Sequence, residues 1–315
     1  MTGKTDQSSM MAPRFREVAT FMRTPFVEDF SSIDIGLVGV PFDGAVTNRP
    51  GARHGPRQVR DMSSMMRTTH HVFKINPYDI CRIGDVGDVP LTNMYDLPTV
   101  NNQITSFYKK LVGEGVFPLS VGGDHSITYP ILRAVAEKGP VGLVHIDAHT
   151  DTWDEWMGSN LNHGAPFRRA VEDGFIDPKW TIQIGIRGAQ NSPEGWNYSK
   201  DSGMRVIFVE EFRELGVEGV LKEIEKVIGN GGCYLSFDID SIDPVYTPGT
   251  GTPEIGGLTP FEGQQLIRGL KAKKLVGADL VEVSPPFDQS GNTALVAATL
   301  VFEMLCIVAE QISDK

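Results

Sequence analysis

Short apolar runs rich in valine and isoleucine recur along the whole chain, with amphipathic stretches between them. Eight of these runs have the length of strands and cover residues 33–40, 80–83, 116–121, 141–146, 181–186, 205–209, 234–237 and 275–283. Six stretches have the pattern of helices: 56–66, 100–112, 128–137, 217–228, 260–270 and 294–309. Since the strands are continuously apolar, we expect a parallel sheet that is buried on both faces.

This alternation predicts an α/β fold, a three-layer α/β/α arrangement around a mainly parallel central sheet of about eight strands. No linker, charge block, shift in composition or internal repeat divides the chain. We therefore expect a single domain over residues 13–315, preceded by a flexible tail over residues 1–12.

Composition and charge narrow the class of protein. The 315 residues, 40% of them hydrophobic, allow a large core, and the formal net charge of -11 disfavours nucleic acid or an anionic membrane as a partner. No stretch approaches the length of a membrane span, so no membrane partner is expected. Cys81, Cys233 and Cys306 are far apart and odd in number, which predicts reduced core thiols and a cytoplasmic location.

The most informative polar residues follow the run 141–146, where Asp147, His149 and Asp151 are spaced two residues apart. On an extended chain such residues share one face. Like charges in one small volume repel each other unless a cation lies between them, so the spacing predicts a metal ion. His145, earlier on the same face, is expected to be a hydrogen-bonded core histidine.

Two similar pieces end other apolar runs. His125 lies in Gly122-Gly-Asp-His-Ser, and Asp238 and Asp240 follow the run 234–237. Alone, a Gly-Gly-Asp-His motif is often an ordinary loop, and an Asp-x-Asp motif is often a turn or a helix cap. Three such pieces at strand ends, the edge where open parallel sheets bind ligands, indicate one shared site.

Six candidate ligands are too many for one small ion and suit two: His125, Asp147, His149, Asp151, Asp238 and Asp240. The set is oxygen-rich and contains no thiolate, so two Mn²⁺ fit the ligand types, with Ni²⁺, Co²⁺ or Fe²⁺ as competitors. Two divalent ions roughly 3.5–4 Å apart can lower the pKa of a shared water and provide a hydroxide nucleophile.

Two further residues could act beside such a centre. Glu282, after the last apolar run, could hold a planar cation by a two-pronged hydrogen bond, or could form an ordinary salt bridge at a strand end. His163, shortly after the second metal piece, could shuttle protons, or could be a surface loop histidine.

Five motifs together resemble the signature of the ureohydrolase family, which includes arginase and agmatinase. They are Gly122-Gly-Asp-His125-Ser, Asp147-Ala-His149-Thr-Asp151, Ser236-Phe-Asp238-Ile-Asp240-Ser-Ile-Asp243-Pro, Pro248-Gly-Thr-Gly-Thr252-Pro and Val281-Glu282-Val-Ser-Pro-Pro. The resemblance runs from Arg14 to Ala309. It implies a binuclear manganese enzyme, a homotrimer or homohexamer, that hydrolyses a guanidino group to an amine plus urea.

The resemblance also implies a role for each residue. One ion would be bound by His125, Asp147, Asp151 and Asp238, and the other by Asp147, His149, Asp238 and Asp240, so that Asp147 and Asp238 bridge. Glu282 would hold the guanidinium, His163 would relay protons and Asp151 would help to protonate the leaving amine. Thr252 would support the site near the hydroxide.

The loop 151–160 differs from that of arginase, because Trp153 and Trp156 replace polar groups and predict a narrower, more apolar pocket. The segment 44–57 resembles guanidinopropionase more than agmatinase or guanidinobutyrase. The expected substrate is therefore a short ω-guanidino acid, with 3-guanidinopropionate giving β-alanine and urea. Its carboxylate would be bound by Asn48, Arg49 or Asn160, although an arginine there could instead contact another subunit.

Three alternatives remain open. Agmatine or 4-guanidinobutyrate could be the substrate. A metal-dependent deacetylase-like amidohydrolase would share the fold, but such enzymes typically use one zinc ion and lack the second histidine ligand, here His149. A non-catalytic protein with a vestigial site would not be expected to keep every ligand.

Overall fold

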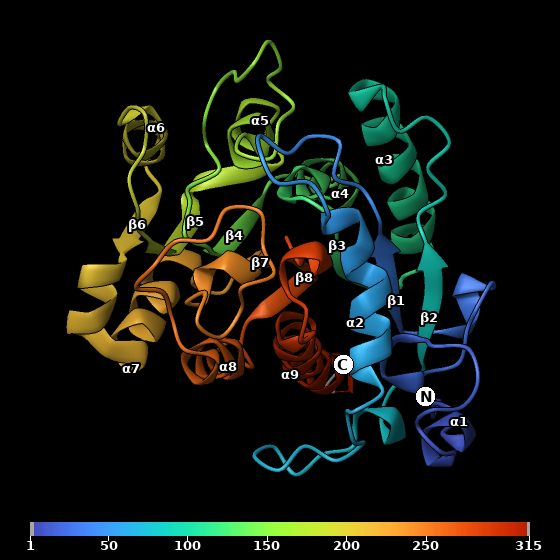
Figure 1. The fold of residues 1–315 in the computed structure, drawn as a ribbon. Helices are drawn as coiled ribbons and strands as arrows, with labels where there is room; N and C mark the ends of the chain where they lie inside the picture. Colours follow the sequence, from blue (N-terminus) through green and yellow to red (C-terminus); the bar gives the residue numbers. More distant parts are fainter. Residues whose placement is uncertain (1–2, 314–315) are drawn as a thin grey trace.

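The computed structural model describes residues 3–313, and within them eight parallel strands form one sheet in the order β2-β1-β3-β8-β7-β4-β5-β6 (Figure 1). The strands are β1 (Ile35–Val40), β2 (Ile83–Asp88), β3 (Phe117–Gly122), β4 (Val141–Ile146), β5 (Ile176–Ile186), β6 (Arg205–Phe208), β7 (Gly232–Asp238) and β8 (Lys274–Val281). The predicted parallel sheet is confirmed.

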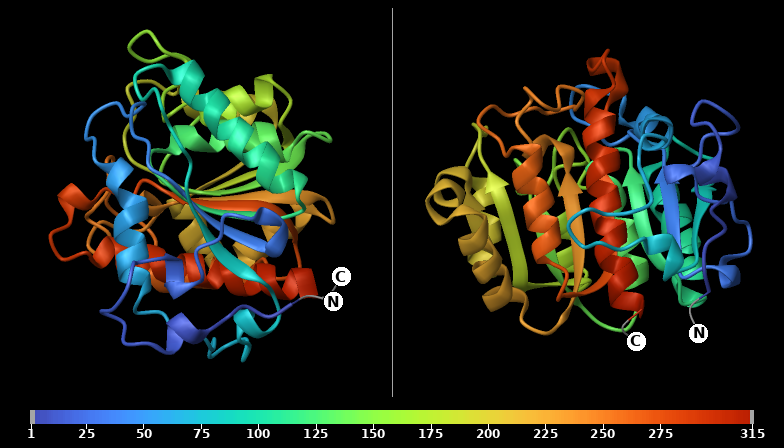
Figure 2. Two further views of the ribbon diagram at one scale, coloured as in Figure 1. Left: turned by 90° about the vertical axis from the view of Figure 1, so that its right-hand side faces the viewer. Right: turned by 90° about the horizontal axis from the view of Figure 1, so that it is seen from below.

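Helices cover both faces of the sheet (Figure 2). On one face lie α3 (Leu97–Gly113), α4 (Thr128–Val135) and α5 (Pro166–Glu172), and on the other α2 (Gly55–Ser63), α7 (Val209–Ile228), α8 (Pro260–Gly269) and α9 (Asn292–Ser313). The described residues also contain α1 (Ser8–Met11) and α6 (Glu194–Ser202), the latter beside β6. The three-layer prediction is therefore confirmed.

Each face of the sheet has its own core. Along β1, Leu37 belongs to the cluster under α2 and α9, whereas Val38 belongs to the cluster under α3 and α4. All six residues of β1 are buried. Because neither face meets water, the strands need apolar residues at every position, which is the pattern seen in the sequence.

Helix α9 corrects one expectation. By length and composition it is long and apolar enough to cross a membrane, but 78% of its most apolar window is buried inside the molecule. It packs against one face of the sheet. Glu303, in the middle of the helix, is 2% exposed and accepts hydrogen bonds from the side chains of Arg268 and His70. The helix is therefore the core helix of this fold.

The edge of the sheet is where sequence prediction was weakest. A strand over residues 80–83 is wrong, because Ile80 closes a 3₁₀ turn over Pro77–Asp79 and β2 begins only at Ile83. Strand β2 contains the buried Asp85, whose carboxylate accepts from Arg60 Nε at 2.8 Å, so its pattern is not apolar. Short helices α5 and α6 were not predicted either.

The prediction of a flexible tail over residues 1–12 is wrong for residues 3–12; residues 1 and 2 lie outside the described part. The Thr5 hydroxyl donates to the carbonyl of Cys81 at 2.7 Å and accepts from the backbone N–H of Ile83 at 2.8 Å. Met10 is buried in the core. The backbone N–H of Thr5 also donates to the carbonyl of Tyr78 at 2.9 Å, so this segment is anchored by polar contacts as well as by Met10.

Four neighbouring central strands, β3, β8, β7 and β4, end at the same edge of the sheet. In the register, Ile146 pairs with Phe237 and Asp238 pairs with Val281. The next residues along the chain, Asp147 and Glu282, therefore emerge beside Asp238. This register brings together side chains that are more than 100 positions apart in sequence.

Candidate active site

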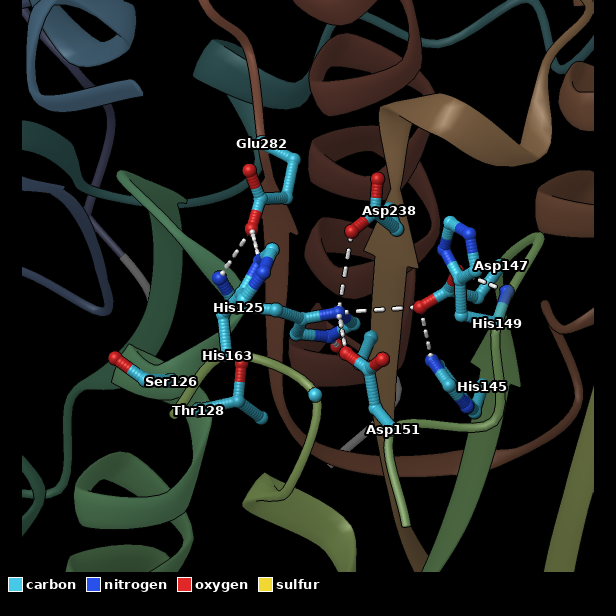
Figure 3. A network of polar contacts seen from close by, with 12 residues as sticks. His125, Ser126, Thr128, His145, Asp147, His149, Asp151, His163, Asp238 and Glu282 are labelled. Carbon is cyan, nitrogen blue, oxygen red and sulfur yellow. Dashed lines mark hydrogen bonds and ion pairs between the residues drawn. The ribbon is translucent and has the colours of Figure 1, made fainter. Parts of the chain in front are cut away.

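Three carboxylates converge on one imidazole nitrogen at this edge, as the dashed lines in Figure 3 show. Nδ1 of His125 lies 3.1 Å from Asp147 Oδ2, 2.9 Å from Asp151 Oδ2 and 3.2 Å from Asp238 Oδ2. All four residues are buried, yet His125 Nδ1 makes no hydrogen bond of acceptable geometry within the described residues. The arrangement is that of four ligands around one cation.

A second group shares one of these carboxylates. Nδ1 of His149 lies 3.1 Å from Asp240 Oδ2 and 3.5 Å from Oδ1 of Asp147, the carboxylate whose other oxygen faces His125. Asp147 therefore lies between the two histidines. All six ligands predicted from the sequence lie in one cluster: His125, Asp147, His149, Asp151, Asp238 and Asp240.

The backbone route to this cluster differs from the expected one. Strand β4 ends at Ile146, so residues 147–151 lie beyond the strand, and Asp151 has a left-handed φ of 50°. Their side chains converge because the chain curls over the strand end. A left-handed conformation is unusual for a non-glycine residue and is typical of functional sites.

Close backbone packing positions His125. A Cβ on Gly123 would lie 1.7 Å from the carbonyl oxygen of Phe42, so no other residue fits there. Gly123 donates to the carbonyl of Val40 and accepts from the backbone N–H of Glu282, both at 2.8 Å. The glycine thus joins the ends of β1, β3 and β8 directly beneath the site.

A buried carboxylate fixes which nitrogen of His125 faces the cluster. The Ser236 hydroxyl donates to Asp279 Oδ1 at 2.6 Å, so its oxygen accepts from His125 Nε2–H at 2.8 Å. Nδ1 is then left with its lone pair towards the three carboxylates. This is the form of histidine that binds a metal.

The electrostatics of the cluster require positive charge. Burial alone would lower the pKa of His125, but the surrounding carboxylates raise it well above its ordinary value. Burial, together with the charges of Asp240 and Asp147, raises the pKa of Asp238 well above its ordinary value. Without metal ions, bound protons would have to compensate the negative charge of the clustered carboxylates, and divalent cations compensate it better.

His145 is completely buried, as expected for a core histidine. Gln183 Nε2 lies 3.1 Å from its Nδ1 and also donates to the carbonyl of Thr150, so Nδ1 accepts and Nε2–H donates to Asp147 Oδ2 at 2.7 Å. His145 therefore orients the shared carboxylate of Asp147.

Glu282 lies beside the cluster in a strained backbone conformation, with φ of 64°. Its Oε1 accepts from the backbone N–H of His125 at 2.9 Å and from Nδ1 of His163 at 2.8 Å. Its Oε2 is buried and has no hydrogen-bond partner within residues 3–313. It is not in a strand-end salt bridge with lysine or arginine in this part of the chain.

His163 is buried, which argues against a surface loop histidine. Its Nε2 lies 3.1 Å from the backbone N–H and 2.9 Å from the hydroxyl of Thr47. The backbone N–H of Thr47 can donate to Nε2 when the imidazole ring is neutral, and the Thr47 hydroxyl can accept from Nε2–H when the ring is charged. Burial alone would lower the pKa of His163, but the charge of Glu282 raises it to about 9.

A cavity of about 210 Å³ opens onto these groups. Trp153 and Trp156 line it, as the sequence predicted, with their rings 6.2 Å apart in an edge-to-face arrangement. Trp156 begins a tight turn closed by reciprocal backbone hydrogen bonds with Ser159. Thr252 also lines the cavity, and its hydroxyl donates to Asp240 Oδ2 at 3.2 Å.

Three predicted substrate contacts are not in the cavity wall. Asn160 lines a separate, much smaller cavity, and neither Asn48 nor Arg49 lines this one. The guanidinium of Arg49 lies 3.8 Å from the centre of the Phe287 ring. The stacking explains why this arginine is not available to a ligand in the cavity.

The structure adds lining residues that sequence reasoning missed, namely Thr47, Asn162, Gly164, Ala189, Gln190 and Asn191. Residues 189–191 follow the carboxyl end of β5, so the rule that ligands bind beyond strand ends could have found them. Their neutral side chains gave no chemical signal.

The chain is similar to known proteins over nearly its whole length. Residues 33–306 match the model of the Arginase family. The chain is 55% identical over 299 residues to the guanidinopropionase of Pseudomonas aeruginosa, covering 95% of this chain and 94% of that protein. It is 49% identical to the mitochondrial agmatinase of Gallus gallus, covering 92% and 86%. Its fold is similar to that of the proclavaminate amidino hydrolase from Streptomyces clavuligerus, with a TM-score of 0.91, 38% identity and coverage of 95% and 99%.

Proposed function

The chain belongs to the arginase family, and on that premise we propose that its substrate is a short ω-guanidino acid, with 3-guanidinopropionate as the first candidate. Its family and its similarity to guanidinopropionase and agmatinase make it a hydrolase of guanidino compounds. The higher identity to a guanidinopropionase than to an agmatinase supports the choice of substrate. Agmatine and 4-guanidinobutyrate are the alternatives.

The observation that carries the proposal is the unpartnered Oε2 of Glu282. A buried carboxylate oxygen without a partner is unfavourable unless a ligand satisfies it. Glu282 lines the same cavity as Asp151 and Asp238. A guanidinium offers a planar fork of N–H donors with a positive charge, the best complement to a carboxylate.

We propose two Mn²⁺ for the centre, with Ni²⁺ or Co²⁺ as alternatives, which the six His and Asp residues of the cluster would hold. Hard oxygen ligands, two imidazoles and the absence of thiolate in the described cluster support this metal. When bound, such a pair of ions lowers the pKa of water and thus supplies a nucleophile near neutral pH.

The residues of the chain then have separate tasks. Glu282 holds and orients the guanidinium, whose carbon gains an oxygen from water as the bond to the chain nitrogen breaks. That nitrogen must take up a proton, and Asp151, which lines the cavity, is the proposed donor. His163 holds Glu282 in place through Nδ1 and exchanges protons with the cavity. The products are an amine and urea.

The test is urea release from guanidinoacetate, 3-guanidinopropionate, 4-guanidinobutyrate, agmatine and arginine, each with enzyme separately loaded with Mn²⁺, Ni²⁺ or Co²⁺. We expect 3-guanidinopropionate to have the highest kcat/KM and the Mn²⁺ form to be the most active. Chelator-treated enzyme is the control. Faster turnover of agmatine than of every ω-guanidino acid would contradict the substrate. Deacetylation of acetylated amines with one zinc ion, without urea release, would support the amidohydrolase alternative.

We also propose a cytoplasmic homotrimer or homohexamer. Phe15, Val18 and Tyr95 are each at least 90% exposed on the isolated chain, more apolar surface than such side chains usually show. Cys81, Cys233 and Cys306 are free and buried, in keeping with a reducing compartment. Light scattering on the metal-loaded protein would test the assembly, and a monodisperse monomer would contradict it.

A further inference from the structure

We propose that Gln190 selects the substrate class, by donating a hydrogen bond from its side-chain amide to the far carboxylate of an ω-guanidino acid. The inference rests on the proposed function, since it assigns the end of the substrate opposite to the guanidinium that Glu282 holds. It replaces Arg49, Asn48 and Asn160 in that role.

Gln190 lies on a firmly held segment. It follows β5, which pairs with β4, the strand that leads into Asp147. The guanidinium of Arg187, three residues earlier, donates to the carbonyls of Gly185, Asp240, Ser241 and Glu254. A Cβ on Gly188 would lie 2.4 Å from Glu254 Oε2, and its φ is +77°. The segment that leads to Gln190 is therefore held in place at Arg187.

The carboxamide of Gln190 is not fully satisfied by the described part of the chain. Its side-chain Oε1 is buried and makes no hydrogen bond among residues 3–313. Of the cavity-lining residues, Gln190 and Glu282 are the two in the described part with a buried, unpartnered side-chain oxygen. The cation of an ω-guanidino acid would satisfy Oε2 of Glu282, and its carboxylate would accept from the N–H groups of Gln190 once the terminal amide is turned over.

The charge of the cavity explains why an amide is used. Within the described residues, no lysine or arginine lines the cavity, whereas Asp151, Asp238 and Glu282 do. His149 and His163 also line the cavity, but they are assigned to a metal ion and to Glu282, so the carboxylate of an ω-guanidino acid would be bound by neutral donors. A glutamine offers two N–H groups, and a half-turn of its terminal amide places either the nitrogen or the oxygen towards the ligand. Asn191 adds a second amide beside it.

The chemistry separates three kinds of substrate. An ω-guanidino acid gains the hydrogen bond from Gln190, an alkylguanidine gains nothing there, and the ammonium of agmatine would prefer an anionic side chain. Gln190→Leu should therefore reduce activity with acids more than with an alkylguanidine. Gln190→Glu should disfavour acids and favour agmatine, because a carboxylate repels one and attracts the other.

The experiment compares kcat/KM for 3-guanidinopropionate, propylguanidine and agmatine in the metal-loaded full chain. For Gln190→Leu we expect a loss of about 10- to 100-fold with 3-guanidinopropionate, mainly in KM, the loss of one hydrogen bond to a charged group. Propylguanidine should change by less than about 3-fold, within the scatter of context effects on a single contact. For Gln190→Glu, kcat/KM for 3-guanidinopropionate should fall further than for Gln190→Leu. The ratio of kcat/KM for agmatine over 3-guanidinopropionate should rise at least about 10-fold, because the new carboxylate attracts the ammonium and repels the acid.

Gln58→Leu is the matched control, because Gln58 also has a buried, unpartnered Oε1 but does not line the cavity. Metal content and melting temperature of every variant show that the site is intact. An equal loss with acid and propylguanidine, or no loss with the acid, overturns the role of Gln190. A preference of the wild-type enzyme for agmatine or propylguanidine over every acid would contradict the proposed substrate itself. The wild type is therefore measured before any variant.

Discussion

Nδ1 of His163 lies 2.8 Å from Oε1 of Glu282, and this contact fixes one carboxylate oxygen while the other faces the cavity without a partner. The backbone N–H of His125 donates to the same Oε1. Glu282 is thus held from two sides in the orientation that exposes Oε2. The proposed guanidinium site is therefore already formed in the absence of a ligand.

Replacing Glu282 should therefore abolish binding with little effect on the metals. Glu282→Gln keeps the shape but removes the charge, and we expect kcat/KM to fall by about 100-fold or more, since breaking a buried charge pair costs roughly 2–5 kcal/mol. Kinetics with 3-guanidinopropionate measure the loss, and metal analysis provides the control. A variant with normal KM would show that the guanidinium binds elsewhere.

The shared position of Asp147 makes a stoichiometric prediction. His149→Ala should remove one ion per chain, because His149 faces one group of ligands only, whereas Asp147→Ala should remove both. Elemental analysis after reconstitution with Mn²⁺ measures the ratio. Chelation of the wild type should also lower its melting temperature, because the clustered carboxylates then repel. Retention of two ions in Asp147→Ala would contradict the shared carboxylate.

The charge on His163 should make its contribution to stability depend on pH. Its pKa is about 9 in the folded chain, above the ordinary value of 6.5. The raised pKa stabilises the folded state fully below about 6.5, and the effect is lost as the pH rises through about 9. The raised pKa contributes at most about 3 kcal/mol to the free energy of unfolding.

The measurement is denaturant unfolding of metal-free wild type and His163→Asn between pH 6 and 9.5. We expect the difference in free energy of unfolding to be largest at pH 6 and to shrink towards pH 9.5. A difference that grows with pH would show that the histidine is held neutral.

Trp156 should limit the length of the substrate. Trp156→Ala removes one aromatic wall of the cavity, and the ratio of kcat/KM for 4-guanidinobutyrate over 3-guanidinopropionate should rise by about 10-fold, as expected for accommodation of one methylene. Trp180→Ala, a half-exposed tryptophan outside the cavity, is the matched control. An unchanged ratio would remove Trp156 from the specificity determinants.

Glu303 should matter for stability alone. It accepts from Arg268 Nε at 2.9 Å and from His70 Nε2 at 2.7 Å while 2% exposed. Glu303→Ala leaves a buried cation uncompensated and should lower the free energy of unfolding by about 3–5 kcal/mol. The kcat of the folded fraction should be unchanged, because Glu303 does not line the cavity. Denaturant unfolding and active-site titration separate the two effects.

The His and Asp residues of the cluster could be predicted because their chemistry is local. Asp147, His149 and Asp151 combine charge, imidazole and close spacing within five residues, and each further ligand follows an apolar run. The path of the backbone could not be read in the same way, since the left-handed turn at Asp151 depends on packing above the strand end. Residue type and spacing predicted that these side chains converge, although they do so beyond the end of the strand.

The far end of the cavity could not be predicted for the opposite reason. Arg49 carries the charge that a carboxylate ligand suggests, but stacking on Phe287 engages it. Gln190 carries no charge, and its place depends on β5 lying beside β4. The edge strand β2 was misplaced because a buried Asp85 interrupts its apolar pattern. In each case a contact distant in sequence decided the outcome.

The position of β8 has a consequence for biogenesis. Among the eight strands of residues 3–313 it is the last along the chain, yet it joins β2-β1-β3 on one side to β7-β4-β5-β6 on the other. His125 emerges from the first half and Asp147 and Asp238 from the second. A nascent chain on the ribosome therefore carries its ligands on two unjoined sheets, and we expect metal loading to wait until translation has passed this strand.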